Sequence, residues 1–418
     1  MLDIKFIRDN VDLVKENCKN RNVSVDIDRL LFLDEERRNL QQQIDDFKAV
    51  RNATSKGKPS EEGIAAMKEL GEKIKKLEDA YKSVEPEYLD HLLVIPNHTH
   101  PDSPIGGESD FDTVEERGKI PSFSYEPKDH EAIMTDLNLL DFERGAKVAG
   151  SKFYFVKNDA VRLNQALLSY GMDILEKHGY TLIETPDLAK DEILDASGFN
   201  PRGAESQTYK IEGTDLNLIG TAEITVLGYH GDEVLDLSDG PKKYAALSHC
   251  YRREAGSYGR ESKGLYRVHQ FTKLEMFIFC KPEESEALHE ELLNIEKEIC
   301  DGLGLAYRVI DIPTGDLGGP AYRKFDIEAF MTMKGDETKV GDYGEITSAS
   351  NCTDYQARRL NIRYTNEEGK PEFVHTLNGT AVVLSRFPIA LLENHQNMDG
   401  SISIPKALQP YFGKDKIS

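Results

Sequence analysis

The chain has 418 residues, of which 39% are hydrophobic and 30% are charged, and its formal net charge is -22. This length suffices for two or three domains with a large buried core. The apolar runs are too short to span a bilayer, and the negative balance excludes a general nucleic-acid-binding protein, although basic groups gathered in one place can still bind RNA. The N-terminal segment carries acidic residues and has no apolar block typical of a signal peptide. We therefore expect a cytoplasmic protein with neither a membrane nor DNA as partner.

The cysteines favour a reduced compartment. They form no CxxC pair, and their number, 5, is odd. Their positions are Cys18, Cys250, Cys280, Cys300 and Cys352. His249 stands beside Cys250, but the spacing typical of a zinc site is absent, so we expect both residues in a strand.

The N-terminal part of the chain predicts helices. Residues 1–27 predict short amphipathic helices. From Leu30 a strict alternation of three-residue and four-residue spacings begins, and most of the positions on it are apolar. These positions are Leu30, Leu33, Arg37, Leu40, Ile44, Phe47 and Arg51, then Met67, Leu70, Ile74, Leu77, Tyr81, Val84 and Tyr88. Two such stretches, separated by a breaker segment at 55–60, predict an antiparallel coiled-coil arm with helices about 40 Å long. Pro86 should make the second helix bend or restart.

The tip of this arm is basic. Lys48, Arg51, Lys56 and Lys58 lie there without an acidic residue among them. Two interpretations stay open: a solvated turn, or a surface that presents positive charge to a phosphate backbone. A loop rich in proline and glycine follows the arm, and we place the domain boundary in it, with domains at 1–115 and 116–418.

The second domain predicts an α+β fold. Its helix-like and strand-like runs do not alternate as βαβ units, so we expect a largely antiparallel sheet flanked by helices. The strand-like runs are 153–156, 181–185, 216–226, 247–279 (a hairpin), 307–312, 324–332, 344–348 and 376–384. The helix-like runs are 159–177, 283–303, 355–361 and 389–397.

The hairpin at 247–279 carries the clearest chemistry. Alternation along its strands should place Arg252 and Glu254 on one face of the first, and Phe271, Lys273 and Glu275 on one face of the second. Arginine suits phosphate, an aromatic ring can stack a base, and a carboxylate can accept from an exocyclic amine. The pattern thus suits a nucleotide, although a hairpin with one solvated face would look similar.

Three further segments gain meaning only beside the hairpin. Thr221 and Glu223 should share a strand face, and Glu345 precedes two hydroxyl residues that suit Mg²⁺ on nucleotide phosphates. The run 349–359 predicts a helix start capped by Thr353 or Asp354. Arg386 lies in an apolar run, where burial is costly unless it meets an anion. The phosphate-loop, dinucleotide-binding and GxSxG motifs are all absent.

These segments, in this order, resemble the class II aminoacyl-tRNA synthetases, and within them the seryl branch of bacterial type. Residues 178–186 resemble the first motif of that class, a dimer element, while 251–254 with the Phe271 strand resemble the second, and Arg386 resembles the arginine of the third. The runs REAGSYGRESKGLYRVHQFTKLE, GEITSASNCTDYQARR and HTLNGT are typical of the seryl branch. The resemblance covers nearly the whole chain.

The resemblance implies an enzyme that joins L-serine to ATP as seryl-adenylate and transfers the seryl group to tRNA(Ser), with tRNA(Sec) as a further candidate acceptor. It implies a homodimer, and it makes the helical hairpin the tRNA-binding arm, with Lys48, Arg51, Lys56 and Lys58 as its candidate contacts. The implied ATP site consists of Arg252, Arg253, Glu254, Val268, Phe271, Glu345, Ile346, Thr347, Ser348 and Arg386. The implied serine site consists of Thr221, Ala222, Glu223, Arg252, Glu275 and Thr380.

Individual roles follow from the same resemblance. Arg252 would hold the α-phosphate and the serine carboxylate, Glu254 the adenine amino group, and Arg386 the γ-phosphate. Val268 would add a backbone contact, Phe271 would stack the adenine, and Glu345 and Ser348 would bind Mg²⁺. Arg252, Glu275 and Arg386 would be the catalytic residues, and no side chain need act as a covalent nucleophile.

The sequence also departs from the family. Thr380 stands where many relatives have serine, and Glu261-Ser262-Lys263 stands where aspartate-threonine-arginine is common. The spelling of 197–203 also differs, which puts the role of that loop in doubt. Two rival functions were weighed. An enzyme that loads a carrier protein would generally lack the arm, and a non-catalytic coiled-coil protein should have lost Arg252, Glu275, Glu345 or Arg386.

Overall fold

The computed structural model describes residues 1–54, 61–198, 207–254 and 263–418. The chain forms two compact units, Met1–His98 and Thr99–Ser418. Residues 99–115, which we expected in the N-terminal domain, belong to the second unit, because β1 (Asp112–Arg117) pairs with β11 (Tyr307–Asp311). In the part of the chain that the structure describes, no helix is long and apolar enough to cross a membrane.

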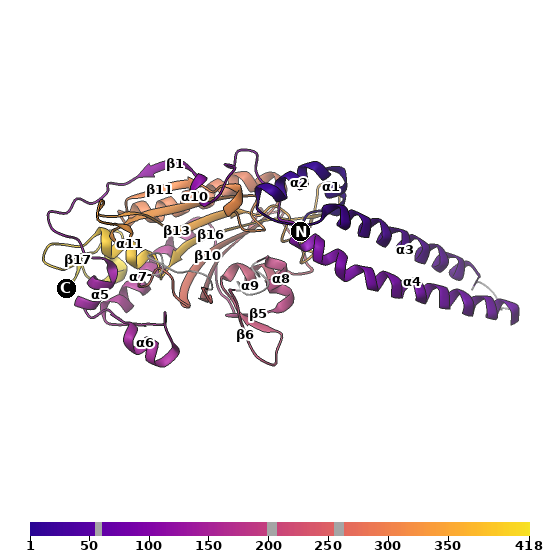
Figure 1. Ribbon diagram of the computed structural model, residues 1–418. Helices are drawn as coiled ribbons and strands as arrows, with labels where there is room; N and C mark the ends of the chain where they lie inside the picture. The colour runs from indigo at the N-terminus through magenta and orange to yellow at the C-terminus, as the bar shows by residue number, and fades with distance from the viewer. Residues whose placement is uncertain (55–60, 199–206, 255–262) are drawn as a thin grey trace. The chain divides into compact units, whose positions relative to one another are not determined.

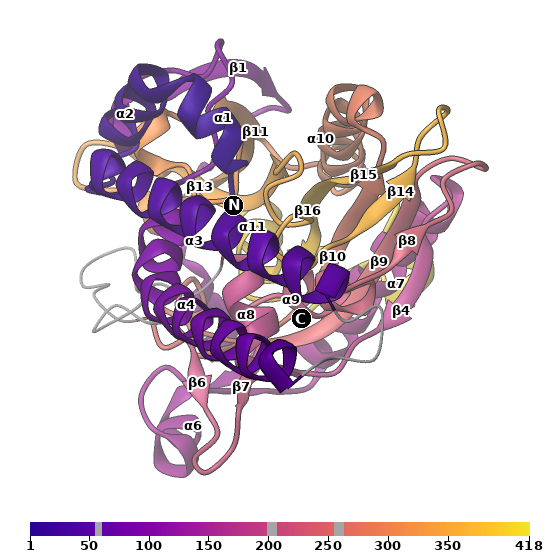
Figure 2. The same ribbon diagram turned by 90° about the vertical axis from the view of Figure 1, so that its right-hand side faces the viewer.

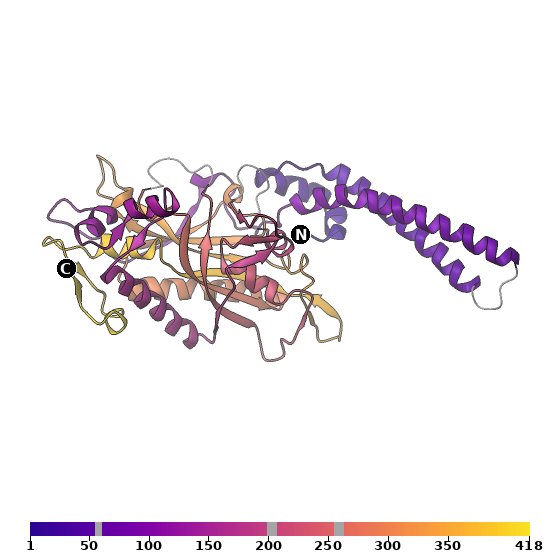
Figure 3. The same cartoon turned by 90° about the horizontal axis from the view of Figure 1, so that it is seen from below.

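The first unit is helical, as the sequence predicts. Two short helices, α1 (Ile4–Asp9) and α2 (Val11–Asn20), precede the long α3 (Ile27–Thr54) and α4 (Glu61–Val94). The long helices lie side by side and antiparallel (Figures 1, 2 and 3). At about 1.5 Å per residue, their 28 and 34 residues span about 42 and 51 Å. The seam residues Leu30, Leu33, Ile44, Ile74 and Tyr88 are buried.

Arg37 occupies one of the predicted seam positions, and its charge is accommodated by aromatic rings. Its guanidinium lies 3.9 Å from the ring centroid of Tyr88 and 5.0 Å from that of Tyr81. It also donates to the Tyr81 hydroxyl at 2.6 Å. A cation over an aromatic face keeps a favourable partner when it loses water, so Arg37 fits a position that otherwise takes leucine.

Helix α4 continues through Pro86, so the expected restart is wrong. A proline removes one hydrogen bond and crowds the preceding turn, but its backbone angle is itself helical. Tyr88 and Leu92, just beyond it, are buried. The packing of this apolar stripe offsets the lost hydrogen bond.

The second unit is built on an eight-stranded sheet in the order β1-β11-β12-β13-β16-β10-β9-β4 (Figure 2). Within this sheet the described neighbours run antiparallel except β4 and β9, as the sequence predicts. Its remaining strands are β4 (Thr181–Glu184), β9 (Lys242–Tyr251), β10 (Gln270–Cys280), β12 (Arg323–Met331), β13 (Asp342–Asn351) and β16 (His375–Val383). Smaller sheets contain β2 (Leu140–Asp141), β3 (Phe155–Val156), β5 (Leu188–Lys190), β6 (Tyr209–Lys210), β7 (Leu216–Leu218), β8 (Val234–Leu235), β14 (Arg363–Thr365), β15 (Pro371–Phe373), β17 (Ile402–Ser403) and β18 (Lys416–Ile417).

Helices cover the large sheet unevenly, and this leaves room for a site. The α-helices of this unit are α5 (His130–Asp136), α6 (Phe142–Ala149), α7 (Asp159–Lys177), α8 (Asp191–Ser197), α9 (Ala222–Tyr229), α10 (Ser285–Gly302), α11 (Phe387–Asn394) and α12 (Gln409–Phe412). On β10, Leu274, Met276 and Ile278 belong to the same core as α7 and α10. On its other face, Phe277 and Phe279 pack in a core with α9. The same face at Phe271–Glu275 lines cavities instead.

Two predicted elements differ from the structure. The strand expected at 216–226 ends at Leu218, and Thr221 caps α9 by accepting from the Glu223 amide at 3.3 Å. The β-branched residues that suggested a strand are instead buried in the helix. The helix expected at 355–361 is a series of turns, and Thr353 has a left-handed backbone (φ 46°).

Candidate active site

The site begins at the open end of the β9–β10 hairpin. The two strands pair from Phe279–Lys242 to Gln270–Tyr251, which confirms the predicted hairpin and places both His249 and Cys250 in a strand. The strand ends at Tyr251, so Arg252 and Glu254 do not continue its alternation, and Glu254 has a left-handed backbone (φ 49°). Hydrogen bonding continues for one more residue, since the Arg252 amide donates to the His269 carbonyl at 3.0 Å.

A polar cavity of about 120 Å³, here called the Arg386 cavity, lies at this end of the hairpin. Its lining residues are Arg252, Glu254, Tyr266, Val268, Phe271, Lys273, Glu345, Ile346, Ser348, Thr380, Val383, Ser385 and Arg386. On one wall the Arg252 guanidinium lies 5.4 Å from the centroid of the Phe271 ring. On another, Arg386 pairs with Glu345 at 2.8 Å. A flat ring and two arginines therefore face one space.

The Arg386–Glu345 pair is strongly charged. Burial opposes ionisation of Glu345, but Arg386 and Lys324 outweigh it, and the pKa of this carboxyl is lowered. Burial likewise opposes the charge on Arg386, while Glu345 raises its pKa. Both groups are therefore ionised at neutral pH, and the cavity holds fixed charges before any ligand arrives.

A bulge in β13 decides which of its side chains reach the cavity. Glu328 and Ile327 of β12 pair with Glu345 and Thr347, which leaves Ile346 as the extra residue. As a result Glu345 and Ser348, three residues apart, line the same cavity. The Thr347 hydroxyl instead donates to Glu296 of α10 at 2.8 Å.

A second cavity of about 450 Å³, here called the Glu275 cavity, adjoins the first through Arg252, Lys273 and Ser348, which line both. Its other lining residues are Ser197, Gly198, Thr221, Glu223, Glu275, Gly318, Gly319, Pro320, Ala321, Lys324, Ser350, Cys352 and Asn378. Of the loop at 197–203 whose role was in doubt, Ser197 and Gly198 contribute here, and the rest lies outside the described residues.

Two carboxyls, Glu275 and the partly buried Glu223, give the Glu275 cavity its character. Glu275 is 2% exposed and pairs with Lys273, and burial raises its pKa. Burial also raises the pKa of Glu223 to about 7, although Gln356 donates to it at 2.6 Å. These groups suit a small ligand that carries both a cation and a hydrogen-bonding hydroxyl.

Most, but not all, of the predicted residues meet here. Thr380 lines the Arg386 cavity rather than the Glu275 cavity. As the described residues outline them, neither cavity includes Ala222, Arg253 or Thr347. Ala222 is buried inside α9, and the Arg253 amide donates to the Gln207 carbonyl at 2.9 Å.

Several residues of the site were missed from the sequence. Lys273 shares the predicted face with Glu275, so its position was available, but its role as the partner of Glu275 was not. Lys324 lies 3.5 Å from Asp326, whose pKa burial raises to about 7. Lys324 and Asp326 belong to no motif, and only sheet pairing brings β12 beside β13.

The predicted contacts of the arm are partly described. Lys48 pairs with Glu78 of the facing helix at 2.8 Å, and Arg51 is half-buried. Lys56 and Lys58 lie outside the described residues. The sequence-based prediction for these four residues therefore stays a prediction.

Comparison with known proteins follows the same division of the chain. Residues 1–99 match the seryl-tRNA synthetase N-terminal domain, and residues 208–395 match the class II tRNA synthetase core domain for glycine, histidine, proline, serine and threonine. A serine–tRNA ligase of Treponema denticola is 53% identical over 425 residues, which cover 100% of both chains. The chain belongs to the seryl-tRNA synthetase family.

Other seryl-tRNA synthetases agree with this chain in length and fold, and a prolyl-tRNA synthetase shares part of the fold. A serine–tRNA ligase of Dictyoglomus turgidum is 50% identical, covering 100% of this chain and 99% of its own. The crystal structure of seryl-tRNA synthetase from Pyrococcus horikoshii complexed with ATP superposes with a TM-score of 0.90 at 37% identity, covering 100% of this chain and 99% of that one. A Giardia lamblia prolyl-tRNA synthetase, 16% identical with a TM-score of 0.57, shares the fold over 67% of this chain and 55% of its own.

Proposed function

We propose that this chain is a serine–tRNA ligase, which activates L-serine with ATP and transfers the seryl group to the 3′ end of tRNA(Ser). The observation that carries the proposal is the junction of the two cavities at Arg252, Lys273 and Ser348. A nucleotide in one cavity and an amino acid in the other would meet there. Two serine–tRNA ligases that are 53% and 50% identical to this chain over its full length support this choice of substrates.

ATP occupies the Arg386 cavity in this proposal. The adenine stacks on Phe271, Glu254 accepts from its amino group, and Val268 offers a backbone contact. Arg252 binds the α-phosphate and Arg386 the γ-phosphate. The Pyrococcus relative, complexed with ATP, supports nucleotide binding by this fold.

Mg²⁺ fits the wall of the same cavity. Glu345 and Ser348 bring a carboxylate and a hydroxyl together there, and Mg²⁺ is commonly held by one or two carboxylates with substrate phosphates completing its shell. Among the described residues no group of three or more His, Cys, Asp or Glu side chains could hold a metal ion. When bound, Mg²⁺ would neutralise charge on the β- and γ-phosphates.

Serine occupies the Glu275 cavity. Its ammonium group pairs with Glu223, its hydroxyl bonds to Glu275, and its carboxylate faces Arg252. The buried charge of Lys273 beside Glu275 keeps that carboxyl available as an acceptor. Thr221 caps the helix that carries Glu223, and we assign it and Ala222 to the shape of this pocket.

The reaction needs positioning and charge neutralisation rather than a protein nucleophile. A serine carboxylate oxygen attacks the α-phosphorus in line, the bond to the bridging oxygen of the β-phosphate breaks, and pyrophosphate leaves with that electron pair. Arg252 faces the charge that develops on the α-phosphate, while Arg386 holds the leaving group. In the second step a ribose hydroxyl of tRNA attacks the seryl carbonyl and AMP leaves.

The helical hairpin is the proposed tRNA-binding arm, with Lys48, Arg51, Lys56 and Lys58 as contacts to the phosphate backbone. The match of residues 1–99 to the seryl-tRNA synthetase N-terminal domain supports this role. Charging of tRNA(Sec) is included in the proposal. Both acceptors are tested by offering transcripts of tRNA(Ser) and tRNA(Sec) in parallel.

We also propose a homodimer in the cytoplasm. Strand β4 is an edge of the large sheet, and Leu182 on it is exposed. The apolar side chains of Phe155, Val161 and Leu188 are exposed as well. An unpaired edge beside apolar side chains favours a partner chain. The five cysteines are buried thiols that form no disulfide, which suits a reduced compartment.

The first test of the whole proposal is ATP–pyrophosphate exchange with Mg²⁺, offering serine, threonine, alanine and cysteine without tRNA. We expect exchange with serine alone. No exchange with any of the four would reject the adenylation site. A sedimentation mass near 47.1 kDa rather than twice that value would reject the dimer.

A further inference from the structure

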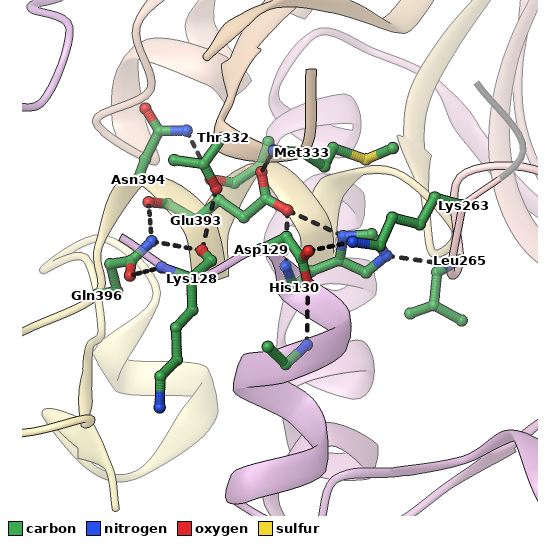
Figure 4. Close-up of polar contacts among 12 residues, drawn as sticks. Lys128, Asp129, His130, Lys263, Leu265, Thr332, Met333, Glu393, Asn394 and Gln396 are labelled. Carbon is green, nitrogen blue, oxygen red and sulfur yellow. Dashed lines mark hydrogen bonds and ion pairs between the residues drawn. The ribbon is translucent and has the colours of Figure 1, made fainter. Parts of the chain in front are cut away.

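Figure 4 shows a buried histidine–glutamate pair, His130 and Glu393, and neither residue lines the Arg386 cavity. His130 begins α5, and Glu393 lies near the end of α11; the side chains of both are 0% exposed. Glu393 Oε1 accepts from the His130 amide at 2.7 Å and lies 2.9 Å from its Nδ1. Glu393 Oε2 accepts from the Met333 amide at 3.0 Å. One carboxylate thus joins three segments of the chain.

The other edge of the imidazole reaches the return segment of the hairpin. The Leu265 amide donates to His130 Nε2 at 3.1 Å. Because a backbone amide can only donate, Nε2 must be the acceptor, so the ring proton is on Nδ1 and points to Glu393. Lys263, two residues earlier, pairs with Asp129 beside His130. The His130 ring is therefore fixed by Glu393 at one edge and holds the Leu265 segment at the other.

The approach of the chain to His130 is unusually close. Gly264 has a left-handed backbone (φ +55°), and a Cβ atom there would lie 2.1 Å from His130 Nε2. Glycine is therefore required at this point, and the following residues are set at a short, defined distance from the ring.

The segment held by His130 leads directly to the residues of the cavity. Tyr266 lies next to Leu265, and the Arg386 guanidinium is 4.9 Å from its ring centroid. The Tyr266 hydroxyl donates to the Glu345 carbonyl at 3.2 Å. Arg386 itself immediately precedes α11, which carries Glu393. His130 and Glu393 thus connect the ring beneath Arg386 to the helix that follows it.

We propose that His130 and Glu393 are positioning residues for the ATP site. They hold the Tyr266 ring and Arg386 in a fixed relative position, so that the guanidinium points to the phosphates. This inference rests on the proposed placement of ATP. The carboxylate and the ring accept from the buried amides of His130, Met333 and Leu265, and in doing so they fix the position of the Tyr266 segment relative to α11. The polar pair adds direction: it fixes the ring orientation and, through it, the Leu265 amide.

The test measures the KM of ATP and of serine separately in pyrophosphate exchange. His130→Ala should raise the KM of ATP about tenfold and leave the KM of serine within twofold of wild type. His130→Gln places an acceptor near the Leu265 amide, so its KM of ATP should lie between that of His130→Ala and that of wild type. His230→Ala is the matched control, since His230 is a half-buried histidine that lines neither cavity and also bonds to a glutamate, Glu233 Oε2 at 2.7 Å.

A double substitution separates this inference from the proposed function. Arg386→Ala should itself raise the KM of ATP, and adding His130→Ala to it should cause little further change, because His130 acts through Arg386. If Arg386→Ala leaves the KM of ATP unchanged, the placement of ATP is wrong. If Arg386→Ala raises it and folded His130→Ala does not, only the positioning role is wrong.

Melting temperatures guard against misfolding. A folded His130→Gln or Glu393→Gln protein with a raised KM for ATP supports the proposal even where His130→Ala does not fold. Failure of all three variants to fold would assign the pair to folding alone and overturn the proposal. An equal increase in the KM of ATP and in the KM of serine would overturn it as well.

Discussion

The Thr347 hydroxyl donates to Glu296 Oε2 at 2.8 Å, on the face of the sheet that α10 covers. Glu296 is 0% exposed and lies beneath the point where β13 and β16 separate. The last pair between these strands is Ala349 with Gly379. Beyond that pair, β13 is bulged at Ile346 and β16 is bulged near Ala381. The separated strands carry Ser348 and Thr380, which line the Arg386 cavity. Glu296 thus supports the cavity from behind.

Glu296 should make stability depend on pH. Burial raises its pKa well above the ordinary value, so the folded protein keeps this carboxyl protonated where the unfolded chain ionises it. Stability from this group is full below about pH 4.5 and declines as pH rises toward the folded pKa, at up to about 1.4 kcal/mol per pH unit. Glu296→Gln cannot ionise, so its advantage over wild type should grow from pH 5 to pH 7.

Urea unfolding of both proteins at several pH values measures this difference. Glu283→Gln, at an exposed glutamate of the same unit, is the control and should show no such trend. A pH-independent difference between Glu296→Gln and wild type would mean that Glu296 is ionised in the folded protein.

Glu275→Ala should raise the KM of serine tenfold or more. The substitution removes the acceptor for the serine hydroxyl and leaves Lys273 without its carboxylate in a buried site. Discrimination against alanine should weaken at the same time, because the wild-type site rejects alanine through an unsatisfied Glu275. Pyrophosphate exchange with both amino acids checks this, and an unchanged KM for serine would reject the proposed role.

Serine activation should follow the ionisation of Glu223. Its pKa is raised to about 7 by burial, so the group is mainly protonated below pH 7 and mainly ionised above it. Only the carboxylate attracts an ammonium group, so kcat/KM for serine should rise through pH 7 and level off near pH 8. In Glu223→Gln the same profile should be lower and flat in this range. An unaltered inflection in that variant would assign it to another group.

Removal of residues 30–92 should separate the two steps of the reaction. The residues that line both cavities lie in the unit Thr99–Ser418, so pyrophosphate exchange should stay within about twofold of wild type. Charging of tRNA(Ser) should be lost, because the proposed phosphate contacts are removed. Efficient charging without the arm would contradict its role. Arg51→Glu in the full chain provides a milder test and should raise the KM of tRNA alone.

Local patterns in the sequence were sufficient for the regular elements. Helices α3 and α4 follow from the spacing of their apolar residues, and α7 spans the predicted residues 159–177. The β9–β10 hairpin and the antiparallel sheet also follow from local alternation and from the order of the elements. Where a segment was short and mostly buried, as at 222–226, burial by the surrounding fold outweighed the strand preference of its β-branched residues.

The sequence by itself thus determined the helical arm, the mixed second domain, the family and fewer than half of the residues that line the two cavities. Only the tertiary structure decided which side chains meet. The bulge at Ile346 turns Thr347 toward Glu296 while Glu345 and Ser348 share a wall, and the partners His130 and Glu393 are 263 residues apart. The physical reason is that periodicity reflects a residue's own backbone, whereas a bulge, a buried ion pair or a ring proton is set by groups that the chain brings together from distant positions.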